Sequence, residues 1–266
     1  MSIEIRHQVL PEEQGCDAAS LLSRLSELPK QRIKDAMSKG AVVLKRKHSK
    51  RLRRASEKLQ AGDQLLLSYD ADILSRSLPD GILCLDQRKT YSIWFKPAGV
   101  MSQGTAFGDH LALLRQVELQ LNKPVFLVHR LDRETAGLML IAHTKAAAAT
   151  LSNLFQQQQI NKVYQAWVAG QAPTQGEITS PLDGKPASTS FKRLAYDENL
   201  NQSQLEITIA TGRTHQIRRH LAELGYPVMG DPRYGKNNKN TAGLQLNAVQ
   251  LSFECPERKQ LVSYTC

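Results

Sequence analysis

Two kinds of hydrophobic pattern alternate along the second two-thirds of the chain. Short apolar runs at residues 90–95, 137–142 and 204–209 have the length and the β-branched or aromatic content of strands. Longer stretches at 145–158 and 215–224 are typical of helices. This succession predicts a mixed α+β domain over the last part of the chain, with a mainly antiparallel sheet and flanking helices.

A second, smaller pattern precedes this domain. The segment 29–40 begins with proline, ends with glycine and keeps its apolar residues on one face, which predicts a short amphipathic helix. Apolar runs at 41–44 and after a Gly-Asp turn predict two strands. We therefore expect a small α/β domain at 1–75, a linker rich in turn residues at 76–88, and the large domain at 89–266.

Basic residues give the chain a formal net charge of +10 and a pI near 9.5. Such a field attracts polyanions, so nucleic acid is the expected partner, although an ordinary basic enzyme is an alternative. Much of the charge lies in the run 45–54, beside the basic predicted helix, where it could contact phosphates or simply form a solvated surface. The candidate RNA-binding residues here are Lys30, Arg32, Lys34, Lys45, Arg46, Lys47, Lys50, Arg51, Arg53 and Arg54.

Other features of the sequence exclude several classes of protein. The four cysteines have neither disulfide-framework nor zinc-site spacing, and the histidines follow no zinc pattern, so we expect reduced thiols and packing or hydrogen-bonding histidines. The N-terminus lacks a signal-peptide pattern, and no apolar run approaches the roughly 20 residues of a membrane span. No phosphate loop or dinucleotide fingerprint is present. We expect a cytoplasmic monomer with no metal, no cofactor and no membrane partner.

One segment places a carboxylate between two guanidinium groups. The sequence VHRLDRETAGL at 128–138 places Asp132 between Arg130 and Arg133. Arginines this close favour the ionised carboxylate and can also hold phosphates. An aspartate between two arginines is, however, more often one half of a structural ion pair. The residue types alone leave both interpretations open.

This segment resembles the signature H-R-L-D-R-x-T-S-G of the pseudouridine synthase family that acts on large-subunit ribosomal RNA and on transfer RNA. Ala136 stands at the usual serine position, and the rest of the signature matches. In that family the aspartate is the essential catalytic residue, so the resemblance implies this role for Asp132. It also implies an isomerase that acts on RNA without a cofactor.

Four further segments resemble motifs of the same family, in the same order. The resemblance implies that the first segment, at 96–100, supports the active-site loop. It also implies that Tyr164, in the second segment, lies against the target base and that Arg213, in the third, pairs with Asp132. Around this site the candidate RNA contacts are Lys96, Lys162, Arg130 and Arg133. The segments are KPAGV at 96–100, KVYQAWVAG at 162–170, TGRTHQIRRH at 211–220 and GDPRYG at 230–235, where Arg233 replaces an apolar residue of many relatives.

The N-terminal part, from about residue 18 to 69, resembles the small RNA-binding domain first known from protein four of the small ribosomal subunit. That domain pairs a basic helix with a hairpin and a late Gly-Asp turn, although the hairpin region of this chain is denser in lysine and arginine. The resemblance implies an RNA-binding domain appended to the catalytic domain. It favours ribosomal RNA over transfer RNA as the substrate.

Pseudouridine formation breaks the bond between the base and the anomeric carbon, turns the base and rejoins it through carbon. Asp132 could add to the base, trap the anomeric carbon or remove a sugar proton, and the sequence leaves these routes open. Arg213 would keep the carboxylate ionised, and Tyr164 would stack on the flipped uracil, a contact worth about 1–3 kcal/mol, and could move a proton late in the reaction.

Two other functions compete with the enzyme. One is a catalytically retired relative that binds RNA or assists ribosome assembly, against which the intact set of Asp132, Tyr164 and Arg213 argues. The other is a nucleoside hydrolase, which is disfavoured because that chemistry usually needs two carboxylates.

Overall fold

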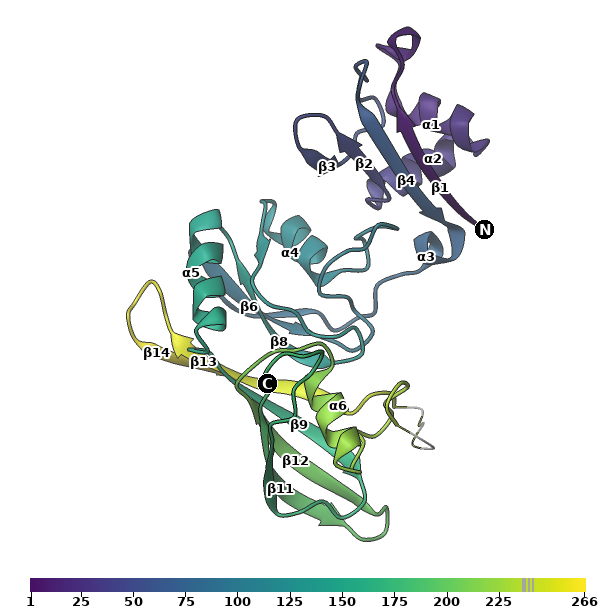
Figure 1. Cartoon of the computed structure of the whole chain (residues 1–266). Coiled ribbons are helices and arrows are strands. Elements are labelled where there is room, and N and C mark those ends of the chain that lie inside the picture. Colours follow the sequence, from purple (N-terminus) through teal and green to yellow (C-terminus); the bar gives the residue numbers. More distant parts are fainter. Residues whose placement is uncertain (236–237, 239, 241) are drawn as a thin grey trace. The chain divides into compact units, whose positions relative to one another are not determined.

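The computed structural model describes residues 1–235, 238, 240 and 242–266, which form two compact units (Figure 1). Unit 1 contains Met1–Leu78 and Gln103–Gln120, and unit 2 contains Pro79–Ser102 and Leu121–Cys266. This division differs from the expected one in two places. Residues 103–120 group with the N-terminal residues, and the segment expected to be a linker contributes a strand to unit 2.

Unit 1 combines an antiparallel sheet, in the order β1-β4-β2-β3, with short helices. The predicted helix at 29–40 is confirmed as α2, and the two predicted strands are β2 and β4. The elements are β1 (Ser2–Gln8), a 3-10 helix (Pro11–Glu13), α1 (Ala18–Ser26), α2 (Lys30–Ser38), β2 (Val42–Lys45), β3 (Ser49–Arg51), β4 (Gln64–Asp70), α3 (Ala71–Ser75) and α4 (Leu113–Leu121), whose last residue falls in unit 2.

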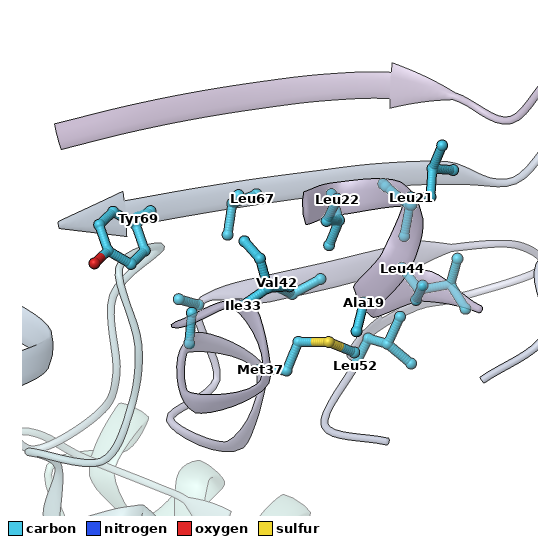
Figure 2. Close-up of a cluster of buried hydrophobic side chains, with 14 of the residues drawn as sticks. Ala19, Leu21, Leu22, Ile33, Met37, Val42, Leu44, Leu52, Leu67 and Tyr69 are labelled. Atoms are coloured by element: carbon cyan, nitrogen blue, oxygen red, sulfur yellow. The ribbon is translucent and has the colours of Figure 1, made fainter. Parts of the chain in front are cut away.

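The core of unit 1 forms where the helices α1 and α2 pack on the sheet. Figure 2 shows Leu22 of α1, Ile33 and Met37 of α2, Leu44 of β2 and Leu67 of β4 among the side chains of this cluster. All five are essentially removed from solvent. Burying each of these side chains contributes roughly 1.5–3 kcal/mol, so their shared interior stabilises the small unit.

Residues 103–112 attach to unit 1 through an aspartate. Asp109 Oδ2 lies 3.2 Å from Arg51 Nε and 2.5 Å from Arg53 Nη2, and the Asp109 amide donates to the Lys39 carbonyl over 2.9 Å. Arg53 also donates to the Ser38 carbonyl over 2.9 Å. These contacts explain why the segment groups with the N-terminal residues, and they neutralise part of the basic run.

Unit 2 is built on a long sheet in the order β10-β11-β12-β9-β13-β8-β6-β5, with β14 on β13 and β7 on β8. Every pairing is antiparallel except that of β8 with β13. The elements are β5 (Leu83–Gln87), β6 (Tyr91–Lys96), β7 (Phe126–Leu127), β8 (Ala136–Ala142), α5 (Lys145–Gln156), β9 (Asn161–Ala169), β10 (Gln175–Ile178), β11 (Thr189–Asp197), β12 (Gln202–Ile209), α6 (Gln216–Glu223), β13 (Leu246–Glu254) and β14 (Leu261–Thr265).

The sequence patterns of this unit are confirmed. The three predicted strands are β6, β8 and β12, and the two predicted helices are α5 and α6, with ends shifted by a few residues at most. The mixed α+β class with a mainly antiparallel sheet is therefore correct. In Figure 1, α6 lies against the part of the sheet that contains β9, β12 and β11, and residues of β9, β12, β13 and α6 line one pocket.

Candidate active site

The loop that carries Asp132 lies between β7 and β8 and is fixed through its backbone. Ser102 Oγ donates to the Leu131 carbonyl over 2.7 Å and accepts from the Leu131 amide over 3.0 Å. The Gly99 amide donates to the Arg133 carbonyl over 2.7 Å. The residues on both sides of Asp132 are thus held by the segment that follows β6.

Lys96 belongs to the same support, which corrects its expected role as an RNA contact. The residue is 0 % exposed, and its ammonium donates to the carbonyls of Pro97, Val100 and Arg133 over 3.1, 2.8 and 3.2 Å. Burial lowers the pKa of Lys96 to about 8, against the attraction of nearby carboxylates. A side chain enclosed in this way binds the active-site loop and is not available to a phosphate.

Gly137 allows the same loop to enter β8. Its φ is +124°, in a region that favours glycine, and a Cβ there would collide with the backbone of Ala248 in the parallel neighbour β13. The glycine of the H-R-L-D-R signature is therefore required by the close approach of two strands.

Arg218 is the arginine that pairs with Asp132. Its Nη1 donates to Asp132 Oδ2 over 3.1 Å, while Nε and Nη2 donate to the two carboxylate oxygens of Asp231 over 2.8 and 2.9 Å. The side chains of Arg218 and Asp231 are 3 % and 0 % exposed, whereas that of Asp132 is 27 % exposed. Burial alone would lower the pKa of Arg218, but the two carboxylates raise it, so the guanidinium stays charged.

The expected pairing of Arg213 with Asp132 is therefore wrong. Arg213 lines the same pocket, but its Nε donates to the Pro186 carbonyl over 3.1 Å. Its amide donates to Gln216 Oε1 over 3.0 Å, a contact that belongs to the start of α6. Arg213 is thus placed at the pocket, and Arg218, the third residue of α6, supplies the charge against Asp132.

Tyr164 lines the same pocket as Asp132. It belongs to β9, where its register partners are Ile207 of β12 and Ala248 of β13, and it is 9 % exposed. Burial raises the pKa of the Tyr164 hydroxyl, and the Asp132 carboxylate raises it further. The phenol therefore stays protonated and presents an aromatic ring to the pocket.

His215 and Tyr234 extend the contacts around Asp132, and the sequence analysis assigned neither of them a role in the reaction. His215 caps α6 in a left-handed conformation with φ of 54°, and its Nε2 lies 3.7 Å from Asp132 Oδ2. Its Nδ1 is 2.9 Å from the Tyr234 hydroxyl. The signals in the sequence were the positions of both residues inside family-like motifs and the three-residue spacing of His215 and Arg218, which places these two on one face of the helix.

The remaining candidate RNA-binding residues differ in how exposed they are. Arg130 is exposed and lines the pocket, and Arg133 is exposed and pairs with Glu134 over 3.1 Å. Lys162 is 9 % exposed, its Nζ is 3.4 Å from the Thr211 carbonyl, and burial lowers its pKa. Its expected contact with RNA is therefore corrected as well, because the ammonium faces the protein.

Within the described ranges, no cluster of three or more acidic, histidine or cysteine side chains is arranged to hold a metal ion. The four cysteines are free thiols. Over the same residues, no helix is both long and apolar enough to cross a membrane.

Comparison with known proteins agrees with this geometry. The family model described as RNA pseudouridylate synthase matches residues 90–223, which is half of the chain and includes the Asp132 loop, β9 and α6. An uncharacterized RNA pseudouridine synthase of Chloroflexus aurantiacus is 37% identical over 155 residues, which cover 52% of this chain and 48% of that protein. The chain thus aligns with only about half of the length of this relative.

Two further matches cover more of the sequence. Ribosomal large subunit pseudouridine synthase D of Neisseria meningitidis is 29% identical over 281 residues, or 92% of this chain and 74% of that protein. The structure of human RNA Pseudouridylate Synthase Domain Containing 1 superposes with a TM-score of 0.61 at 22% identity, covering 70% of this chain and 83% of that one. This last likeness establishes the fold.

The chain belongs to the RNA pseudouridylate synthase family, as the H-R-L-D-R segment implied.

Proposed function

We propose that this protein converts one or more uridines of ribosomal RNA to pseudouridine, with Asp132 as the catalytic carboxylate. The observation that supports this most strongly is the placement of Asp132. Its carboxylate is partly open to a pocket, is held by the buried Arg218 and lies beside the ring of Tyr164. An anionic oxygen at the mouth of a pocket, next to an aromatic face, suits attack on a flipped nucleoside.

Base flipping explains the rest of the pocket. A uridine turned out of its stack loses pairing and stacking energy of a few kcal/mol, less in a single-stranded loop, and it needs new contacts in compensation. Tyr164 offers stacking for the base, and the exposed Arg130 and the partly exposed Arg213 offer positive charge for the flanking phosphates. We assign these three residues to substrate binding, and Arg218 to the support of Asp132.

Unit 1 is proposed to hold the RNA outside the active site. After the ion pairs of Arg46, Arg51 and Arg53 are set aside, exposed lysines and arginines remain on α2 and around β3. Their charge gives a sequence-independent attraction to phosphates. Ribosomal RNA is favoured over transfer RNA because the relative from Neisseria that covers most of the chain is named for the large ribosomal subunit.

The test is a map of pseudouridines in total RNA, in which carbodiimide adducts stop reverse transcription. Cells with the gene, cells without it and cells carrying Asp132→Asn are compared, because asparagine keeps the shape of the side chain and removes its charge. We expect one or a few stops in ribosomal RNA to disappear without the gene and to stay absent with Asp132→Asn. Identical maps in all three strains would instead favour an RNA-binding relative without activity.

A further inference from the structure

Besides the carboxylate of Asp132, the reaction needs a base that acts at the uracil ring. When the base rejoins the anomeric carbon through C5, C5 still carries its hydrogen. The C5 proton must then leave, and N1 must gain a proton, so that the product is an isomer of the substrate. A group that accepts the C5 proton has to face the same pocket as Asp132.

Few side chains of the described pocket can accept a proton. Apart from apolar, hydroxyl and amide groups, the residues that line it are arginines and three others: Asp132, Tyr164 and His215. Asp132 accepts a hydrogen bond from Arg218 and is already assigned to cleavage of the glycosidic bond. Tyr164 is a poor base, because burial raises the pKa of its hydroxyl and the phenol keeps its proton. His215 is the side chain that remains.

Among the residues that the structure describes, only one ring nitrogen of His215 has a hydrogen-bond partner. Nδ1 is 2.9 Å from the Tyr234 hydroxyl, within hydrogen-bonding distance. Nε2 is 3.7 Å from Asp132 Oδ2, which is too far for a hydrogen bond but close enough for electrostatic attraction. That Asp132 oxygen already accepts from Arg218 over 3.1 Å. A proton on Nδ1, donated to Tyr234, therefore leaves the lone pair of Nε2 available.

We propose that His215, oriented by Tyr234, accepts the C5 proton of the rejoined base in the reaction assigned above. The C5–H bond breaks, its electron pair restores the conjugated ring, and the proton passes to Nε2. The resulting imidazolium faces the Asp132 carboxylate, which stabilises the new charge, and it later returns the proton to water. N1 takes a proton from solvent, so atoms and charge balance.

The charges around His215 suit this role. Burial lowers its pKa, Asp132 and Asp231 act in the opposite direction, and Arg218 and Arg233 lower it further. The imidazole is consequently neutral, and able to accept a proton, at neutral pH. The Tyr234 ring is fixed in turn, because the Tyr234 amide donates to Asp231 over 3.0 Å and the Arg218 guanidinium lies 5.3 Å from the ring centre.

The experiment measures loss of the C5 hydrogen directly. Single-turnover conversion is followed with a target RNA carrying either hydrogen or deuterium at C5 of the reactive uridine. The variants are His215→Asn and Tyr164→Phe; asparagine tolerates the left-handed backbone of position 215 and cannot serve as a base. We expect His215→Asn to slow conversion by roughly 10²-fold or more. We also expect it to show a primary isotope effect larger than that of the wild type.

Tyr164→Phe decides between the two candidate bases. A large isotope effect in Tyr164→Phe, with the wild-type value in His215→Asn, would overturn the proposal. So would a slow His215→Asn enzyme without an enlarged isotope effect, because His215 would then act on another step. RNA affinity and thermal unfolding of each variant are measured alongside. If His215→Asn unfolds, His215→Gly with added imidazole replaces it, and failure of imidazole to restore the rate counts against the proposal.

Failure of the proposed synthase activity would give a different result from failure of the His215 assignment. If wild-type protein leaves the RNA unchanged, as Asp132→Asn should, the proposed activity itself fails. If the wild type converts the RNA and His215→Asn does so at the same rate, only the assignment of His215 fails. The pH profile adds a further readout, since the acidic limb that comes from protonation of His215 should be absent in His215→Asn.

Discussion

Arg218 donates to Asp132 with one edge of its guanidinium and holds Asp231 with the other. The Asp132 carboxylate, which we propose as the catalytic group, is partly open to the pocket and is thereby tied to a buried ion pair that belongs to the framework of unit 2. Pairing with a fixed charge keeps Asp132 oriented before the substrate arrives. The same arrangement makes the stability of the unit and the activity depend on one side chain.

Replacement of Arg218 by methionine should therefore have two effects. Activity should be lost, because Asp132 loses its partner, and the free energy of unfolding should fall by about 3–5 kcal/mol, because Asp231 is left buried without a counter-charge. Single-turnover assays and urea unfolding measure the two effects. Arg213→Met is the matched control and should leave stability nearly unchanged.

A second substitution separates these effects. Asp231→Asn in the Arg218→Met background removes the uncompensated charge, so much of the lost stability should return. Activity should stay lost, because Asp132 still has no arginine. A double variant with wild-type activity would show that Arg218 matters for folding alone.

The choice between Arg213 and Arg218 shows where sequence reasoning ends. Both arginines lie in the T-G-R-T-H-Q-I-R-R-H segment, and the pattern of the segment predicts a helix without fixing its first residue. The left-handed conformation of His215 starts α6 at Gln216, which turns His215 and Arg218 toward Asp132 and leaves Arg213 on the preceding loop. The residue at which α6 begins therefore determines which arginine pairs with Asp132.

Burial sets a similar limit for the lysines. The alternation of apolar and polar residues was enough to predict the mixed fold, the main strands and the helices, because those depend on local periodicity. Lys96 and Lys162 stand in strands of that fold, yet their ammonium groups bind carbonyls of loops distant in sequence. A lysine that faces the protein cannot be told from one that faces RNA until the loops are in place.

Lys96→Met should destabilise the protein and slow the reaction without weakening RNA binding. The substitution keeps the apolar stem and removes the ammonium that donates to the carbonyls of Pro97, Val100 and Arg133. Loss of donors to buried carbonyls costs about 1–3 kcal/mol. Thermal unfolding, single-turnover rates and RNA titrations test this. Arg130→Gln, at an exposed pocket position, should instead weaken RNA binding and leave stability unchanged. Weaker RNA binding by a fully stable Lys96→Met would support the original prediction that Lys96 contacts a phosphate.

His129 should make the protein sensitive to acid. Its Nε2 accepts from the Leu140 amide over 2.9 Å, and its ring stacks on Phe155 at 4.5 Å. Burial, followed by the charge of Lys162, lowers the pKa of His129 to about 3. Because the unfolded chain takes up this proton near pH 6.5, stability is fully present above about pH 6.5 and is lost as the pH falls toward 3, by at most about 1.4 kcal/mol per pH unit.

The measurement is urea unfolding at a series of pH values between about 4 and 8. His129→Gln should flatten the dependence of the unfolding free energy on pH, because glutamine can accept from Leu140 and does not titrate. The same substitution at the exposed His48 controls for the loss of a histidine as such. An unchanged slope in His129→Gln would assign the acid sensitivity to other groups.

The basic run of unit 1 contains two kinds of cation, and they should respond differently to substitution. Lys47 is exposed and forms no ion pair with any residue that the structure describes, whereas Arg53 binds Asp109 and the Ser38 carbonyl. If Lys47 contacts a phosphate, Lys47→Gln should lower the slope of log affinity against log salt by about 0.7–0.9 and leave thermal unfolding unchanged. Arg53→Gln should lower the unfolding temperature and change the slope less. Anisotropy titrations of a labelled ribosomal RNA fragment over a range of salt concentrations distinguish the two, and equal slopes for Lys47→Gln and wild type would place the RNA elsewhere on the protein.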